Sequence, residues 1–174
     1  VHYGYSVVKY KINKDFMPIL DDISQNDWIV YTDYFGICKD QNKEKIISLY
    51  KNVIFDNTQG FFSKPIIRDN IFNVYSCRKF FGVSDGAYII SNRKENIDNL
   101  YDVDLSWERC AYLIKSYEVG TNGAYKDNLQ SEESIGFEIK LMSKFTQRLL
   151  GGIDYHSIKE KRKLNYNYLV KQLK

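Results

Sequence analysis

Apolar and polar positions follow two different periods in the first half of the chain. Short runs rich in β-branched and aromatic residues are separated by polar turns, which is typical of strands. The segment QNKEKIISLYKN instead places Ile46, Ile47 and Tyr50 on one face of a helix. This alternation predicts an α/β fold with a mainly parallel sheet flanked by helices. The predicted strands are SVVKYKI (6–12), DWIVYTDYF (27–35), NVIFDNT (52–58), IFNVYS (71–76) and GAYIIS (86–91), and DFMPILDDISQ (15–25) is a predicted short helix or turn.

From about Asn96 onward the spacing becomes helical. QSEESIG (130–136) is expected to be a polar loop between helices. A helix over LMSKFTQRLLGGI (141–153) is predicted because Leu141, Phe145, Leu149 and Ile153 recur every four residues before two glycines. The other predicted helices are LSWERCAYLIKSYEVG (105–120), which ends at Gly120, and DYHSIKEKRKLNYNYLVKQLK (154–174), whose apolar stripe includes Tyr166, Leu169, Val170 and Leu173.

Length and charge place the chain among ordinary globular proteins. Its 174 residues suffice for one domain with a core, or for one domain and a fragment of another. The formal net charge is only +3, and the basic run KEKRK (159–163) is interpreted as a solvated helix face rather than a nucleic-acid patch. The sequence shows no run of about 18 apolar residues and no signal peptide. We therefore expect no membrane span, no nucleic-acid partner and a cytoplasmic location.

Cysteine and histidine are too few and too widely spaced to suggest a metal site. The chain has three cysteines without a CxxC pair and only two histidines, which favours a reducing compartment. Cys77 is expected to be a small buried residue, and His156 to be a solvated residue at a helix start. The chain opens on Val1 within a strand-like pattern, so we expect it to be a piece of a longer protein.

An acid and an amine follow two successive predicted strands. Asp56 ends the apolar run of VIFDNTQ, and Lys79 follows the run of VYSCRK. Ligands of α/β proteins bind beyond the carboxyl ends of strands, so both groups are predicted to face one crevice. Pyridoxal 5'-phosphate requires this pair, because a lysine amine bonds to its aldehyde and a carboxylate pairs with its ring nitrogen. Phe80 and Phe81 are expected to shield the lysine partly from water.

Two further residues are candidates for the same cofactor. The amide of Gln59 is placed to reach the ring hydroxyl, and the hydroxyl of Ser76 to contact the phosphate. The residues alone leave a second interpretation open. An aspartate at a strand end often forms a turn, and a lysine beside aromatic residues often lays its stem along them with the amine in water.

Several segments, in consistent order, resemble the DegT/DnrJ/EryC1/StrS family, the sugar aminotransferases of fold type I. VIFDNTQ is similar to the family's Asp-x-x-Gln/His strand, and YSCRKFFGVSDGAYII to its lysine segment. DYFG (33–36) resembles a strand-end segment that precedes the aspartate, and LMSKFTQRLLGGIDYHSIKEKRKLNYNYL resembles a helix pair that leads into the small domain. The resemblance implies a cofactor-binding large domain over residues 1–135, and helices that open the small domain over residues 136–174.

The resemblance also implies roles for the matching positions. Lys79 would bond to the cofactor, Asp56 would pair with the ring nitrogen, and Gln59 would lie near the ring oxygen. The implied activity is transfer of an amino group, commonly from glutamate, to a keto-sugar nucleotide, by a homodimer. The chain also departs from the family. Val74 stands where the family has a serine, which displaces Ser76, and the glycine-rich turn after the lysine is reduced to SDGA. The family's Asn-x-Arg-like segment is not recognisable in GFEIKLMS, and neither the phosphate-binding Gly-Thr loop nor the end of the small domain is present. The competing hypothesis is a catalytically inactive fragment or degenerate homologue that serves as a binding or scaffolding domain.

Overall fold

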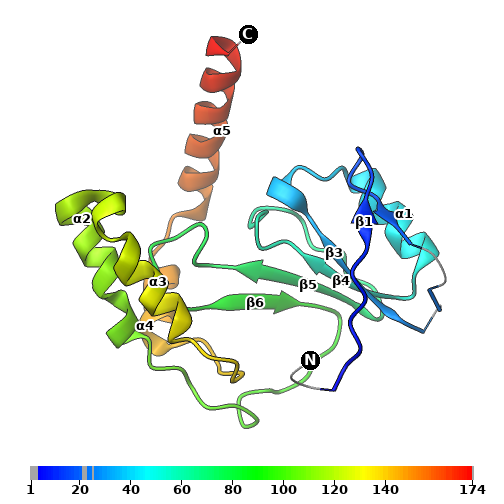
Figure 1. Cartoon of the computed structure of the whole chain (residues 1–174), viewed down its shortest axis with the longest axis horizontal. Coiled ribbons are helices and arrows are strands. Elements are labelled where there is room, and N and C mark those ends of the chain that lie inside the picture. The colour runs from blue at the N-terminus through cyan, green and yellow to red at the C-terminus, as the bar shows by residue number, and fades with distance from the viewer. Residues whose placement is uncertain (1–3, 21–22, 25, 174) are drawn as a thin grey trace. The chain divides into compact units, whose positions relative to one another are not determined.

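A computed structural model describes residues 4–20, 23–24 and 26–173, and the chain forms two compact units (Figure 1). The first unit comprises the residues up to Lys79 together with 87–95, and the second comprises 80–86 together with the residues from Asn96 onward. The expected boundary between residues 135 and 136 lies inside the second unit. The assignment of 1–135 to a cofactor-binding domain and of 136–174 to small-domain helices stays a prediction.

The first unit contains a mixed four-stranded sheet. Its strands are β3 (Trp28–Thr32), β4 (Asn52–Asp56), β5 (Ile71–Ser76) and β6 (Ala87–Ile90), and they lie side by side in that order (Figure 1). β3 is parallel to β4 and β4 to β5, whereas β6 runs antiparallel to β5. The predicted α/β fold with a largely parallel sheet is therefore confirmed at this coarse level.

The core of the first unit lies on one face of this sheet. Alternate strand residues turn to this face, so Tyr31 and Phe55 are buried there with their rings edge to face at 6.0 Å. Ile46 of α1 (Asp40–Leu49) is fully buried against the same cluster. On the opposite face, Trp28 is 47% exposed and Val30 is 49% exposed. The helix predicted from Ile46 and its neighbours is thus confirmed.

The amino-terminal part forms less sheet than its pattern predicts. The expected strand over 6–12 is reduced to β1 (Lys11–Ile12), which pairs antiparallel with β2 (Pro18–Ile19). The side chain of Asn13 accepts the backbone N–H groups of Asp15 and Met17 at 2.9 and 3.0 Å, which fixes a tight turn where a helix or turn was expected. Residues 21, 22 and 25 of that segment lie outside the described residues.

The second unit is helical. Its helices are α2 (Ala111–Gly123), α3 (Tyr125–Glu133), α4 (Lys144–Gly151) and α5 (Tyr155–Gln172). The helix expected over 105–120 begins with a 3-10 turn at Trp107–Cys110 and breaks where expected, at Gly120, whose φ is 78°. The expectation of a loop over 130–136 is wrong for its first residues, because α3 continues to Glu133. Among the described residues, no helix has the length and apolar character needed to cross a membrane.

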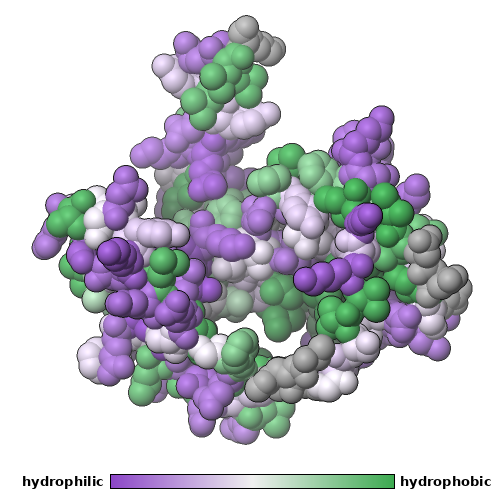
Figure 2. All heavy atoms as spheres, viewed as in Figure 1, coloured by the Kyte–Doolittle hydropathy of each residue, from purple (hydrophilic) through white to green (hydrophobic). Residues whose placement is uncertain are grey.

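The apolar residues of α4 and α5 are used differently from what their spacing suggests. In α4 the buried residues are Thr146 and Leu150, while Phe145 and Leu149 are 46% and 40% exposed. The stripe on α5 is exposed along its length, and Figure 2 shows hydrophobic side chains at the surface near the end of this helix. The spacing thus predicted both helices, but not which face is buried.

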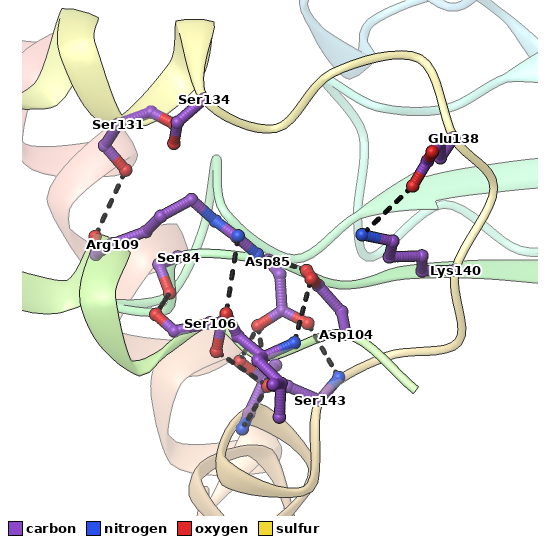
Figure 3. Close-up of polar contacts among 12 residues, drawn as sticks. Ser84, Asp85, Asp104, Ser106, Arg109, Ser131, Ser134, Glu138, Lys140 and Ser143 are labelled. Carbon is purple, nitrogen blue, oxygen red and sulfur yellow. Dashed lines mark hydrogen bonds and ion pairs between the residues drawn. The ribbon is translucent and has the colours of Figure 1, made fainter. Parts of the chain in front are cut away.

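A buried carboxylate joins the segments of the second unit (Figure 3). Asp85 accepts the backbone N–H of Ser143 at 2.8 Å and its hydroxyl at 2.9 Å, and it also accepts the hydroxyl of Thr146. Ser143 is the N-cap of α4, and its hydroxyl accepts the backbone N–H of Thr146 at 3.1 Å. The same hydroxyl lies 2.7 Å from that of Ser106. Asp85 therefore fixes the start of α4 against the loop after Lys79.

The Asp85 cluster predicts a dependence of stability on acidity. Burial by itself raises the pKa of Asp85, but hydrogen bonds from Ser143, Thr146 and Ser106 outweigh it and lower the pKa below its ordinary value of 3.8. The contribution of Asp85 to folding is therefore complete above that value and is lost as the pH falls through the lower pKa of the folded state. We expect the free energy of unfolding to fall as the pH decreases below the ordinary value of 3.8.

Asp85→Asn tests this assignment by urea unfolding at several pH values. The substitution is expected to cost about 1–3 kcal/mol at neutral pH and to flatten the acid branch of the stability curve. Asp98→Asn is the matched control, because Asp98 is exposed in the same unit. An unchanged acid branch in Asp85→Asn would contradict the prediction.

Candidate functional site

The carboxyl ends of β4 and β5 place two of the predicted residues on one edge of the sheet. The strands are parallel neighbours, and Asp56, the last residue of β4, pairs with Val74 of β5. Ser76, the last residue of β5, lies two positions beyond Val74 and so on the same face as Asp56. This is the half-open face of the sheet, away from α1, and both residues are half-buried. The structure thus brings Asp56 and the end of β5 together.

Thr58 connects the predicted acid with the predicted amine. The side chain of Asp56 accepts the backbone N–H of Thr58 at 3.0 Å, which forms a tight turn after the strand. The hydroxyl of Thr58 accepts a hydrogen bond from Nζ of Lys79 at 3.3 Å. Asp56 and Lys79 therefore contact the same residue from two strand ends. The turn formed by Asp56 is the alternative that the sequence left open, whereas the contact of Lys79 with Thr58 was not predicted.

The amide orientation of Gln59 is fixed by the neighbouring loop. Its Oε1 accepts the backbone N–H of Phe35 at 2.7 Å, and because that N–H can only donate, the side-chain oxygen must face it. The NH₂ group of the Gln59 amide therefore faces away from the N–H of Phe35 and is available as a donor. The two loops approach closely, since a Cβ on Gly36 would lie 2.9 Å from the backbone oxygen of Gln59, and the φ of Gly36 is 68°.

A buried ion pair stabilises the two loops that carry Phe35 and Gln59. Nζ of Lys43 on α1 lies 2.8 Å from Oδ2 of Asp33, and their side chains are 5% and 1% exposed. Lys43 also donates to Oδ1 of Asn57 at 3.2 Å, and Asp33 accepts the hydroxyl of Ser63 at 3.0 Å and the backbone N–H of Cys38 at 3.0 Å. This Asp33–Lys43 cluster joins the end of β3, the start of α1 and the loop that carries Thr58 and Gln59.

Sequence reasoning missed the Asp33–Lys43 cluster, although part of its signal was visible. Asp33 follows a buried strand, and Lys43 lies in the first turn of the following helix, next to the buried positions. A lysine at such a position is ordinarily solvated, so the sequence alone gave no reason to bury it.

The neighbouring phenol of Tyr75 donates to the backbone oxygen of Ser63 at 3.0 Å, and burial together with the charge of Asp33 raises the pKa of Tyr75 to about 12. Tyr75 is therefore neutral at physiological pH.

The surroundings of Lys79 differ from the expectation. Lys79 is exposed, so the predicted shielding by Phe80 and Phe81 is wrong. Both phenylalanines belong to the second unit, where Phe81 packs edge to face on Tyr155 and Arg162 lies over the ring of Phe80. The amine is thus open to small molecules from solution, and its one described hydrogen-bond acceptor is Thr58.

The remaining candidates lie away from this edge or play structural parts. Cys77 is fully buried, as expected, and all three cysteines are free thiols. His156 is exposed as the second residue of α5, also as expected. Within residues 4–20, 23–24 and 26–173, no group of three or more histidine, cysteine or acidic side chains is arranged to hold a metal ion.

Comparison of the chain with protein-family models, with curated protein sequences and with solved structures finds no match. The interpretation of the site therefore depends on the arrangement of its own residues. Asp56, Thr58, Gln59 and Lys79 offer a carboxylate, a hydroxyl, an amide donor and an amine at the carboxyl edge of one sheet. Such a set suits a planar, polar ligand with a group that an amine can attack.

Proposed function

We propose that the chain is part of a pyridoxal-phosphate-dependent aminotransferase of the DegT/DnrJ/EryC1/StrS type. The reaction would move an amino group from an amino acid, with glutamate as the proposed donor, to a keto-sugar nucleotide. The single observation that carries the proposal is that Asp56 and Lys79 converge on Thr58 from neighbouring strand ends. The sequence resemblance in VIFDNTQ and YSCRKFFGVSDGAYII supports the same choice, and with it a homodimeric cytoplasmic enzyme.

The residues present fit the ring of the cofactor. Asp56 offers a carboxylate for the ring nitrogen, and the NH₂ of Gln59 is left free of Phe35 to donate to the ring oxygen. Lys79 offers an exposed amine for the aldehyde. For the phosphate, we propose the hydroxyl of Ser76, at the end of β5, as one contact, and we propose that most of the others come from residues outside this chain.

The proposed chemistry divides between two residues of the chain. Bound pyridoxal phosphate supplies an aldehyde that amines attack and a ring that withdraws electrons. Lys79 would hold the cofactor through its aldehyde, and its Nζ, once free of that bond, would act as a general base toward the α-carbon proton of the donor. The carboxylate of Asp56 would pair with the ring nitrogen and favour its protonated form.

Covalent capture of the cofactor tests the proposal directly. The 174-residue chain is incubated with pyridoxal phosphate, reduced with borohydride, digested, and searched for the mass added to each lysine peptide. Attachment concentrated on the Lys79 peptide is expected. Attachment spread evenly over exposed lysines, or none at all, would overturn the proposal.

Asp56→Asn is expected to weaken cofactor binding without disturbing the turn. The oxygen of an asparagine can still accept the backbone N–H of Thr58, but the charge opposite the ring nitrogen is lost. A charge-assisted hydrogen bond is worth about 1.5–3 kcal/mol, so half-saturation should need about 10- to 100-fold more pyridoxal phosphate. The measurement is the titration of trapped Lys79 adduct, and equal half-saturation in both proteins would contradict the role of Asp56.

The competing function is a binding or scaffolding domain without a cofactor. The exposed stripe on α5 favours this alternative, since Leu164, Tyr166 and Leu173 are all more than half exposed. Under this hypothesis the Lys79 peptide gains no more label than other exposed lysines. The trapping experiment therefore separates the two functions.

A further inference from the structure

We infer that Thr58 is a positioning residue, whose hydroxyl holds the free amine of Lys79 at the Asp56 end of the site before the cofactor arrives. The inference deepens the proposed function and depends on it. It gives a role to a residue that lies between the predicted acid and Gln59. Its basis is one chain of contacts, from the Asp56 carboxylate through the Thr58 backbone to the Thr58 hydroxyl and Lys79.

Thr58 has a fixed position because its turn is held at several points. Its own N–H is bound by Asp56 at 3.0 Å, and the N–H of Gly60 donates to the backbone oxygen of Asn57 at 2.9 Å. Asn57 is fully buried and accepts Lys43, so the turn rests on the Asp33–Lys43 cluster. Gly60 also packs tightly, since a Cβ there would lie 2.7 Å from Oγ of Ser63. The hydroxyl of Thr58 is thus presented from a rigid support.

The amine of Lys79, in contrast, has no hydrogen-bond partner other than Thr58 among the residues that the structure describes. Lys79 is exposed and follows β5 by three residues, and a free lysine side chain samples many rotamers. Threonine is branched at Cβ and has few χ1 rotamers, so its oxygen is a well-defined acceptor. Binding that oxygen selects the lysine conformers that point toward the end of β4. The amine is then already oriented when an aldehyde enters beside Asp56.

Two substitutions at Thr58 separate the hydroxyl from the turn. Thr58→Val keeps the branched shape and the backbone N–H that Asp56 binds, but it removes the acceptor. Thr58→Ser keeps the acceptor and is the matched control. Two rates are measured on the Lys79 peptide of each protein by mass spectrometry. One is labelling by a small amine reagent without affinity for the site, in the absence of cofactor, and the other is attachment of pyridoxal phosphate.

Opposite changes in the two rates are expected for Thr58→Val. Labelling of Lys79 should rise about two- to fivefold relative to Lys51 in the same sample, because one exposed hydrogen bond no longer holds the amine. Attachment of pyridoxal phosphate should fall by a similar factor, because the amine is no longer oriented. Thr58→Ser should match the wild type in both. If Thr58 acted only in folding, Thr58→Val would raise labelling at Lys51 as well, or the labelling rate and the attachment rate would not change in opposite directions.

Failure of this inference differs from failure of the proposed function. Suppose that the wild type attaches pyridoxal phosphate at Lys79 and that Thr58→Val shows the same labelling rate and the same attachment rate as the wild type. Only the role of Thr58 is then overturned. The same holds if Thr58→Ser behaves like Thr58→Val. If the wild type attaches no cofactor at Lys79, the proposed function fails, and the role of Thr58 toward the cofactor fails with it.

Discussion

Lys79→Ala is expected to abolish covalent attachment of pyridoxal phosphate at this site. Alanine has no amine to bond to the aldehyde, and no other lysine contacts Thr58 at the carboxyl edge of the described sheet. In an active assembly, the loss of both the covalent link and the general base should lower transamination by at least about 10³-fold. Borohydride trapping with peptide mapping, followed by an amino-transfer assay on the assembled enzyme, measures both effects.

Lys45→Ala is the matched control for the loss of a lysine. Lys45 is exposed on α1 in the same unit, and alanine is the better helix former at that position. This variant should attach the cofactor at Lys79 as the wild type does. Total attachment that stays the same in Lys79→Ala would show that another residue captures the cofactor, and the assignment of Lys79 would be wrong.

Lys43→Met is expected to destabilise the first unit by about 3–5 kcal/mol. Methionine fits the space of the lysine stem but leaves the buried carboxylate of Asp33 without its cation, and it leaves Asn57 without its donor. The remaining partners, Ser63 and the backbone of Cys38, do not neutralise the charge. Urea unfolding followed by circular dichroism measures the change in the free energy of unfolding.

Two comparisons show whether the effect comes from the ion pair. Lys45→Met, two residues away on the exposed face of α1, should change stability by less than about 0.5 kcal/mol. Adding Asp33→Leu to Lys43→Met should recover part of the loss, because the uncompensated charge is removed as well. A loss below about 1 kcal/mol in Lys43→Met would mean that the ion pair contributes little to the fold.

The candidate site was predictable only in part, and the reason lies in the range of the contacts. The local apolar patterns predict that β4 and β5 end in polar residues. Parallel pairing of the two strands then places those ends on one edge of the sheet. Thr58, however, lies 21 residues from Lys79, and Gln59 lies 24 residues from Phe35. No periodicity links such positions, so the sequence offered Asp56, Gln59 and Lys79 as separate candidates without the residue that connects two of them.

Local pattern by itself determined the strands β3 to β6 and the helices α1, α2, α4 and α5, because side-chain periodicity reflects burial on one face. It did not identify α3, whose last residues were expected to form a loop. Only the tertiary structure decided which charges are buried and that the side chain of Lys79 is exposed. Asp33 and Lys43 are buried because they neutralise each other, and Asp85 because Ser143, 58 residues away, satisfies it. The cost of burying a charge depends on its partners in space, and the order of residues along the chain does not specify them.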